Sequence, residues 1–279
     1  MTTRALEGRR LTKTAEGKDW IFVSDAHFNG RKPGEMDPFV RFLEEEKDRM
    51  ETLVILGDLF EFFFGFQGNT PKGGRPPGHP SFAFADYLPI LEQLQRLYRR
   101  GVRIKYFEGN HDFSLASFFF EHFGMEVEVY PQESEERLGG RKAYLAHGDL
   151  SNPRQWGYRA LRRTLKNRWA YGVIRWMGPR FSRKVARCMS EVSYDLSHPD
   201  DLQEAPPAFR AFAHQKFLEG FEVVVLGHSH FPEKVEERID GRSCLYFNTG
   251  DWRTHQSFLR FTPPEQFRLE GFEGGRKER

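Results

Sequence analysis

The sequence predicts an α/β protein in which a largely parallel sheet is covered by helices on both faces. Apolar runs rich in β-branched residues alternate along most of the chain with segments whose apolar residues recur at helical spacing. Strands that are connected through helices run parallel, because the helix returns the chain to the end of the sheet where the previous strand began. The 279 residues, 38% of them hydrophobic, are enough to bury a sizeable core.

Five apolar runs define the expected strands. They are WIFV from residue 20, LVIL from residue 53, VRIKYF from residue 102, KAYLA from residue 142 and EVVVL from residue 222. Short apolar runs that are bounded by polar residues or glycine are typical of buried strands.

Two helices are expected between the first three strands. The first begins at Asp37-Pro38, with Asp37 as the capping residue and Pro38 at the first helical position. Its apolar positions are Phe39, Phe42, Leu43 and Met50. The second covers residues 83–100 and ends at Gly101, a typical helix-ending residue. Its inward positions are Leu88, Leu91, Leu94 and Leu97.

Residues 151–207 interrupt this alternation. They contain no strand-like run, and their aromatic and basic residues recur at helical spacing, so we expect a helical insertion, or cap. The core would comprise residues 15–150 and 208–265. It would close with a β-hairpin formed by SCLYFNTGDW and SFLRF, and residues 266–279 would be a frayed tail.

The composition favours a cytoplasmic protein. Charged residues make up 29% of the chain, and no run approaches the ~18 apolar residues of a membrane span. The N-terminal residues lack the apolar stretch of a signal peptide. The two cysteines, Cys188 and Cys244, are far apart, which is typical of a reducing compartment.

The basic residues are concentrated in one segment. The net charge is only +2, yet eleven Lys or Arg and no Asp or Glu lie between Arg154 and Arg187. This asymmetry predicts an anionic partner, such as a phosphate, a nucleic acid or an acidic membrane surface.

Each expected strand is followed by side chains that can bind metals, at the edge of the sheet where α/β proteins bind ligands. They are Asp25 and His27, then Asp58, then Asn110, His111 and Asp112, then His147 and Asp149, and finally His228 and His230. Oxygen and imidazole donors without a thiolate suit Mn, Fe, Zn or Mg. Their number suits two ions, about 3.5–4 Å apart, that share a carboxylate, clamp a phosphoryl group and activate water.

The motifs DAH, GD, GNHD, HGD and GHSH, in this order, resemble those of the calcineurin-like metallophosphoesterases. The resemblance implies a four-layer α/β/β/α sandwich around two divalent ions, which we expect to be Mn²⁺, with Fe, Zn or Mg as alternatives. It implies that one ion is held by Asp25, His27, Asp58 and His230. It implies that the second is held by Asp58, Asn110, His147 and His228, with Asp58 bridging.

The same resemblance leaves one histidine for chemistry. His111 would lie beside the substrate phosphate, where it stabilises developing charge or protonates the leaving group. Asp112 would orient His111, and Asp149 would hold the turn at the strand end or a histidine.

A narrower resemblance concerns the substrate. GDLFEFFFGF, GNHDF, AHGD followed by Tyr158, and NTGDW are similar to the UDP-2,3-diacylglucosamine pyrophosphatases of lipid A synthesis, which carry a helical insertion after HGD. This implies hydrolysis of UDP-2,3-diacylglucosamine to UMP and 2,3-diacylglucosamine 1-phosphate. The chain departs from the better-known members at His111, where they have Arg, and at LSNPRQWGY, where they have acidic residues.

The insertion and the phenylalanines after Asp58 are expected to bind such a lipid. A basic segment with several tryptophans resembles an interfacial membrane element, so we expect the enzyme to act peripherally at the anionic inner membrane. Phe60, Phe62, Phe63, Phe64 and Phe66 are expected to wall a groove for acyl chains. The expected substrate-binding residues are Tyr158, Arg159, Arg162, Lys166, Phe62 and Phe64.

Two other functions remain open. The chain could be a metallophosphoesterase that acts on another nucleotide diphosphate or phosphoester, with equal rates on acylated and deacylated substrates. It could also be a metal-dependent scaffold or a nucleic-acid-binding module, with a steeply salt-dependent affinity and no hydrolysis. Because a scaffold has no need of His111, we expect an enzyme and no nucleic-acid partner. The sequence does not indicate an oligomeric state.

Overall fold

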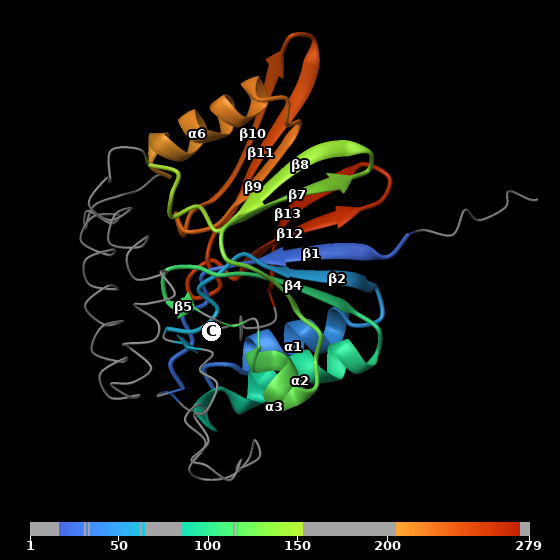
Figure 1. Cartoon of the computed structure of the whole chain (residues 1–279), viewed down its shortest axis with the longest axis vertical. Coiled ribbons are helices and arrows are strands. Elements are labelled where there is room, and N and C mark those ends of the chain that lie inside the picture. Colours follow the sequence, from blue (N-terminus) through green and yellow to red (C-terminus); the bar gives the residue numbers. More distant parts are fainter. Residues whose placement is uncertain are drawn as a thin grey trace, which may run out of the picture.

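The computed structural model describes residues 17–30, 32, 34–61, 63–64, 85–113, 115, 117–152 and 205–273. They form two large β-sheets that pack face to face, with helices on both outer faces (Figure 1). This is the four-layer α/β/β/α sandwich that the resemblance implied.

The first sheet has the strand order β13-β12-β1-β2-β4-β6. Its strands are β1 (Asp19–Val23), β2 (Met50–Ile55), β4 (Arg103–Phe107), β6 (Glu128–Tyr130), β12 (Ser257–Thr262) and β13 (Gln266–Gly271). The strands β1, β2, β4 and β6 are parallel, whereas β12 and β13 form an antiparallel hairpin beside β1.

The second sheet has the strand order β10-β11-β9-β8-β7. Its strands are β7 (Glu133–Leu138), β8 (Arg141–Ala146), β9 (Val223–Leu226), β10 (Pro232–Ile239) and β11 (Arg242–Thr249). The three central strands are parallel, and β7 and β10 are antiparallel edges. A separate pair, β3 (Phe63–Phe64) and β5 (Asp112–Phe113), lies close to the site described below.

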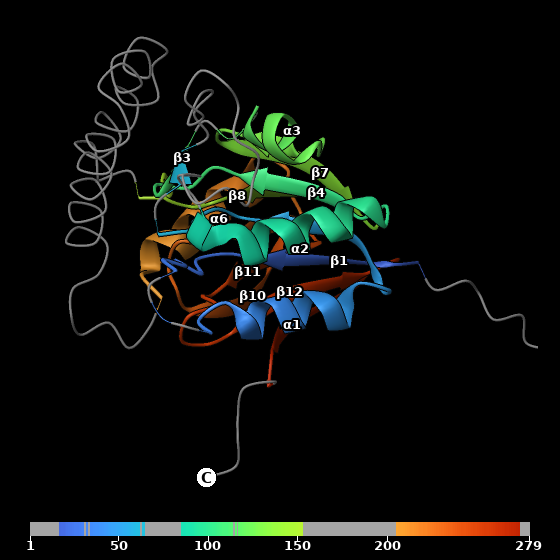
Figure 2. The same cartoon turned by 90° about the horizontal axis from the view of Figure 1, so that it is seen from below.

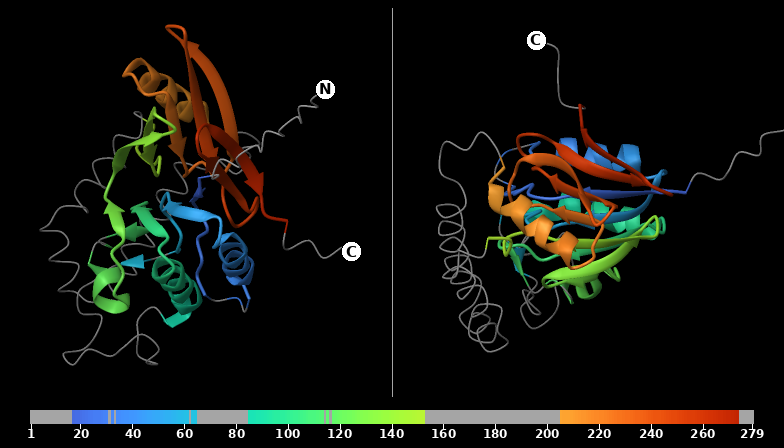
Figure 3. Two further views of the ribbon diagram at one scale, coloured as in Figure 1. Left: turned by 90° about the vertical axis from the view of Figure 1, so that its right-hand side faces the viewer. Right: turned by 90° about the horizontal axis from the view of Figure 1, so that it is seen from above.

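The helices cover the outer face of each sheet. The first sheet is covered by α1 (Asp37–Glu46), α2 (Leu88–Arg99), which follows the 3₁₀ turn η1 (Ala85–Tyr87), and α3 (Phe118–Phe123) (Figure 2). The second sheet is covered by α6 (Pro207–Leu218), which Figure 3 shows crossing its outer face. Three buried apolar clusters fill the three interfaces, and Phe42, Val54 and Phe217 are examples, one from each.

The two-sheet architecture corrects three expectations. Each sheet has helices on one face only, because its other face packs against the second sheet. The expected closing hairpin is wrong, since β11 belongs to the second sheet and β12 to the first. Residues 266–271 are not a frayed tail, because they pair with β12 as β13. Alternating apolar residues predict a strand but do not determine which other strand pairs with it.

The helix boundaries also differ from those expected. The residue Asp37 is the first residue of α1, follows the N-cap Met36 and makes no side-chain capping bond. The helix ends at Glu46, and Met50 begins β2 instead of continuing the apolar stripe. The second helix starts at Leu88, after a 3₁₀ turn, instead of at residue 83.

The expected insertion at 151–207 falls almost entirely outside the described residues, so the division into core and insertion stays a prediction. Within the described part of the chain, no helix has the length and apolarity that crossing a membrane requires.

A buried arginine ties three neighbouring strands of the first sheet to α1. The guanidinium of Arg260, which is 3% exposed, donates to Asp19 at 2.8 Å, to both oxygens of Glu46 at 2.8 Å and to Glu270 at 3.1 Å. These carboxylates raise the pKa of Arg260 further above its ordinary value. One side chain therefore connects β12, β1, α1 and β13.

Replacing this arginine should destabilise the fold. In Arg260→Ala, the buried Asp19 carboxylate would keep only the long 3.8 Å contact to the exposed Arg49, and the half-buried Glu46 would lose both of its bonds to Arg260, which costs about 3–5 kcal/mol. The free energy of unfolding, measured by urea denaturation, should fall by that amount. The control is Arg268→Ala, whose half-exposed side chain pairs with Glu270 at 3.3 Å. Equal stabilities of the two variants would contradict this account of Arg260.

Candidate metal centre

The potential ligands from all five strand ends come together at one edge of the two sheets. In the described structure, three groups of side chains have ligand atoms within 4.8 Å of one another. They are Asp25, His27 and His230, then Asp25, Asp58, His147 and His228, and finally His27, Asp58 and His111. The sequence therefore identified the members of the cluster.

The first group converges on Asp25. Its Oδ1 lies 3.4 Å from His230 Nε2 and 3.8 Å from His27 Nε2, and the two imidazole nitrogens are 3.3 Å apart. The same Oδ1 is buried and has no hydrogen-bond partner among the residues that the structure describes. A buried carboxylate oxygen and two imidazole nitrogens that face one space fit a divalent cation.

The second group converges on His147. Its Nδ1 bonds the Leu56 carbonyl at 2.6 Å, which directs Nε2 into the site. That Nε2 lies 3.4 Å from Asp58 Oδ2, 3.0 Å from Asn110 Oδ1 and 3.1 Å from His228 Nδ1. This is the set expected for the second ion. Asp25 is also close to it, which the expected assignment did not include.

The carboxylate of Asp58 stands between the two groups. Its Oδ2 is 3.4 Å from His147 Nε2 and 4.0 Å from His27 Nε2, so one oxygen faces a ligand of each expected ion. Its Oδ1 accepts a hydrogen bond from the His111 amide at 2.9 Å, which fixes the orientation of the carboxylate. This position suits a bridging ligand.

Five of the expected ligands have left-handed backbone conformations. The φ angles are 52° at Asp25, 48° at His27, 54° at Asp58, 65° at His228 and 61° at His230. Such a conformation in a residue other than glycine costs about 1–3 kcal/mol and persists only where the surroundings enforce it. Here the adjoining buried strands hold each residue, and their concentration at one place marks a functional site.

The glycine that precedes a ligand in three motifs allows close approach. A Cβ on Gly57 would lie 2.6 Å from His147 Nδ1, and one on Gly227 would lie 2.7 Å from Asp25 Oδ2. A Cβ on Gly109 would overlap the Asp58 carboxylate. The backbone of each motif therefore packs directly against a ligand from another strand.

The pKa values of most expected ligands favour the protonation states that bind a cation. Burial alone would raise the pKa of Asp25 and of Asp58, but neighbouring imidazoles outweigh it and hold both well below their ordinary values. Burial lowers the pKa of His27, and burial together with the charge of His147 lowers that of His228 to about 3. Two carboxylates are thus ionised and two histidines neutral, as metal ligands must be.

The imidazole of His147 behaves differently. Burial would lower its pKa, but the charge of Asp58 and the bond to it outweigh burial and raise the pKa to about 10. Without a cation His147 therefore carries two protons at neutral pH. A metal bound at Nε2 would take the place of one of them.

His111 lies beside the two groups. It is 8% exposed, and its Nδ1 bonds the Glu61 carbonyl at 2.8 Å. Its Nε2 then faces the centre, 3.8 Å from Asp58 Oδ2. His111 also belongs to the third ligand group, so the geometry allows it either to contact substrate or to bind a cation.

Asp112 does not orient His111 as expected. Its Oδ2 accepts a hydrogen bond from the Tyr106 hydroxyl at 2.6 Å and its Oδ1 one from the Gly109 amide at 2.5 Å. Burial and the charge of Asp58 raise its pKa to about 7. Asp112 therefore shapes the GNHD turn, and the group that bonds the His111 ring is a backbone carbonyl.

Glu61 was missed by the sequence analysis. Its carbonyl bonds His111, and its carboxylate lies 3.7 Å from His27 Nδ1 and 4.0 Å from His111 Nδ1. The amide of Glu61 donates to the Phe28 carbonyl at 2.9 Å, which holds this loop against the DAH motif. The sequence could have indicated Glu61 through its position three residues after Asp58, within GDLFE.

Asn248 was missed as well. Its side chain donates to the Gly227 carbonyl at 2.7 Å and accepts from the Gly250 amide at 3.1 Å. It thereby joins NTGDW to GHSH and supports the turn that carries His228.

Most expected substrate contacts remain untested. Tyr158, Arg159, Arg162, Lys166 and Phe62 lie outside the described residues, as does Phe66, and of Phe64 only the backbone is described, in β3. Two of the expected groove residues are core instead. Phe60 and Phe63 are fully buried in the cluster under the first sheet, where the Phe60 ring stacks on Tyr87 and the Phe63 ring meets Phe118 edge to face.

Metal binding should release a proton from His147. At pH 8 this histidine lies below its pKa of about 10, so a cation at Nε2 displaces about one proton. Titration of Mn²⁺ into the metal-free protein by calorimetry in buffers of different ionisation enthalpy, such as Hepes and Tris, measures this number. Heats that do not depend on the buffer would contradict the protonation of His147.

Comparisons with known proteins agree with this centre. Residues 20–232 match the family model of the calcineurin-like phosphoesterases. A protein named UDP-2,3-diacylglucosamine hydrolase from Aeromonas salmonicida is 31% identical over 257 residues, which cover 90% of this chain and 92% of that protein. A protein of the same name from Pseudomonas aeruginosa is 28% identical over 239 residues, which cover 83% and 90%.

Among solved structures, a predicted phosphoesterase from Streptococcus pneumoniae is 13% identical, with a TM-score of 0.37 over 87% of this chain and 81% of that one. The family assignment does not depend on this weak similarity. The family model covers most of the chain and spans all five ligand-bearing motifs. The chain therefore belongs to the calcineurin-like phosphoesterase family and is a metal-dependent hydrolase of phosphoesters or pyrophosphates.

Proposed function

We propose that this enzyme uses two divalent ions to hydrolyse the pyrophosphate of UDP-2,3-diacylglucosamine, releasing UMP and 2,3-diacylglucosamine 1-phosphate. The observation that carries the reaction class is the pair of adjacent ligand groups with Asp58 between them and His111 alongside. Relatives named UDP-2,3-diacylglucosamine hydrolase, matched over nearly their whole length, support the substrate.

The residues fit two ions. Asp25, His27 and His230 would hold one, Asn110, His147 and His228 would hold the other, and Asp58 would contact both. Such ions, when bound, neutralise phosphoryl oxygens and lower the pKa of water. We expect Mn²⁺, and Fe, Zn or Mg also suit donors of this kind.

The protein itself would supply orientation and one proton-bearing group. The imidazole of His111 is fixed through Nδ1 by the Glu61 carbonyl, which leaves Nε2 to face the substrate phosphate. There it would donate to a phosphoryl oxygen and, as bond cleavage proceeds, to the leaving oxygen. The Glu61 carboxylate, near both His27 and His111, would favour these ring orientations.

The enzyme would act at an anionic membrane surface. The support is the run of eleven basic and no acidic residues between Arg154 and Arg187, interleaved with tryptophans. Tyr158, Arg159, Arg162 and Lys166 of this run would contact the substrate, and Phe62 and Phe64 would contact its acyl chains.

A second candidate is hydrolysis of another nucleotide diphosphate or phosphoester. The observation that favours it is His111, since the pyrophosphatases that the chain resembles have Arg at that position, whereas generic phosphoesterases share the histidine.

Removing a bridging ligand or the free histidine should abolish or slow UMP release. The metal-loaded Asp58→Ala variant should show only background release, because both ions lose a ligand. The metal-loaded His111→Ala variant should be about 10²–10⁴-fold slower, as expected for loss of a general acid. A matched control is His214→Ala, whose imidazole pairs with Glu237 on the surface.

Release of UMP from UDP-2,3-diacylglucosamine is followed by chromatography in each case. No UMP from the wild-type enzyme with any of Mn²⁺, Mg²⁺, Zn²⁺ or Fe²⁺ would exclude the proposed substrate. Full activity of His111→Ala would exclude the assigned role of that residue.

The acyl chains should matter for turnover. Burying only two methylenes contributes about 1.6 kcal/mol, so kcat/KM should be about tenfold or more higher for the diacylated substrate than for deacylated UDP-glucosamine. Both rates are measured as UMP release in the same mixed micelles. Equal kcat/KM values would favour the second candidate function.

A further inference from the structure

One turn outside the ligand motifs packs against the expected site of the first ion. Residues 252–255, here called the rim turn, lie between β11 and β12. Because β12 is antiparallel to β1, the rim turn lies at the edge of the sheets where β1 ends (Figure 1). The Trp252 amide donates to the Asp25 carbonyl at 3.3 Å, and a Cβ on Gly250 would lie 2.9 Å from the Pro232 nitrogen. The rim turn is therefore fixed between the DAH motif and the residues that follow GHSH.

A buried carboxylate orients the histidine of the rim turn. Asp251 is 4% exposed, and its Oδ1 accepts hydrogen bonds from the Thr254 amide at 3.1 Å, from the His255 amide at 2.8 Å and from His255 Nδ1 at 2.9 Å. The bond to Nδ1 leaves Nε2 as the imidazole nitrogen that can contact a ligand. The His255 ring centroid lies 6.1 Å from that of Phe231, which directly follows His230. The imidazole is thereby held beside an expected ligand of the first ion.

The exposed side chains of the rim turn suit an anion. Arg253, Thr254 and His255 are all exposed. Among the residues that the structure describes, the Arg253 guanidinium has no ion pair. When both nitrogens of the His255 ring carry protons, Nδ1 donates to Asp251 and Nε2 can donate to a ligand. A guanidinium, a hydroxyl and an imidazole on one turn match a phosphoryl group, whose oxygens are charged and accept hydrogen bonds.

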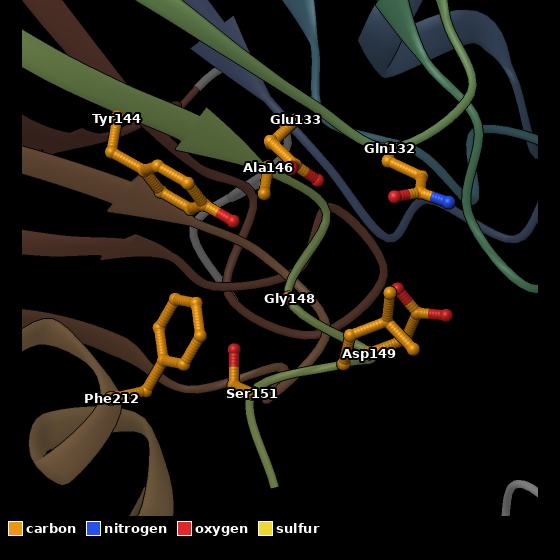
Figure 4. A pocket seen from close by; sticks show the side chains of 9 residues that line it. Gln132, Glu133, Tyr144, Ala146, Gly148, Asp149, Ser151 and Phe212 are labelled. Carbon is orange, nitrogen blue, oxygen red and sulfur yellow. The ribbon is translucent and has the colours of Figure 1, made fainter. Parts of the chain in front are cut away.

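The role assigned to His111 places the leaving phosphate on this side of the centre. Between ring centroids, His27 lies 4.6 Å from His111 and 5.1 Å from His230. A leaving oxygen that takes its proton from His111 therefore departs beside the ligands of the first ion, towards the residues that follow His230. On the side of the second ion, the hollow lined by Tyr144 and Ser151 (Figure 4) has space for about one water molecule, which is too little for a phosphoryl group.

We propose that the rim turn binds the leaving phosphate of the substrate, which is the phosphoryl group that water does not attack. The inference rests on the proposed function, because a pyrophosphate has such a second phosphoryl group and a simple phosphoester does not. His255 Nε2 and the Arg253 guanidinium contact its oxygens, and Asp251 is the positioning residue for the imidazole. These contacts stabilise the negative charge that develops on the leaving phosphate as the bridging oxygen separates from the attacked phosphorus.

Ligand affinities test this contact without turnover. The probes are UMP and α,β-methylene-UDP, which carries the second phosphoryl group on a methylene bridge that resists hydrolysis. Calorimetry of the metal-loaded protein measures both affinities for the wild type, His255→Gln and Arg253→Gln. The matched controls are His214→Gln and Arg268→Gln, which change a surface histidine on α6 and a half-exposed arginine on β13. Bound-metal content and Tm verify that each variant is folded and loaded.

His255→Gln and Arg253→Gln should each weaken binding of α,β-methylene-UDP about three- to tenfold and change that of UMP by less than about twofold, whereas the controls change neither. Equal losses for the two ligands, or no loss for either, would overturn the proposal. A loss seen only in binding to vesicles of phosphatidylglycerol and phosphatidylcholine would also overturn it, because the turn would then bind lipid headgroups. Failure of the wild-type enzyme to release UMP from UDP-2,3-diacylglucosamine would overturn the proposed function instead.

Discussion

The structure depends on two buried carboxylates that face histidine nitrogens. Asp25 and Asp58 are at most 1% exposed, and Asp25 Oδ1 has no hydrogen-bond partner in the described part of the chain. Water cannot stabilise these charges, and the neighbouring imidazoles do so only in part. A cation held between them would supply the missing interaction, so binding of metal and stability of this edge are coupled.

Hydrogen bonds made by these aspartates and histidines also join the two sheets. The amide of His228, after β9 of the second sheet, donates to Asp25 Oδ2 at 2.8 Å, after β1 of the first. The ring of His147, after β8, bonds the Leu56 carbonyl, after β2. The close approach of these motifs to one another requires the glycines at 57, 109 and 227 and the left-handed conformations of five expected ligands. The face-to-face packing of the two sheets thus brings the five strand ends close together. A cation bound by their Asp and His side chains would support hydrolysis of phosphoesters.

Much of this site could be predicted because its signal is local. A β-branched run followed by Asp, Asn or His identifies both a strand and the residue at its end. All five runs form strands, and the histidine and aspartate side chains at their ends lie together as expected. The pairing of strands could not be predicted, because alternation of buried residues is the same for any partner. SFLRF therefore pairs with β1 and β13 and not with β11.

The contacts that orient the ligands were also beyond prediction. Asp112 is adjacent to His111 in sequence, yet its carboxylate turns toward Tyr106 and Gly109, and a backbone carbonyl of Glu61 bonds the imidazole. A backbone group has no sequence signature. Phe60 and Phe63 follow Asp58, but the chain direction after the turn carries both side chains into the core.

Anomalous diffraction from crystals grown with Mn²⁺ would show whether two ions lie on either side of Asp58. Two peaks about 3.5–4 Å apart are expected, one beside His27 and His230 and the other beside His147 and His228. A single peak, or two peaks that Asp58 does not reach, would contradict this arrangement.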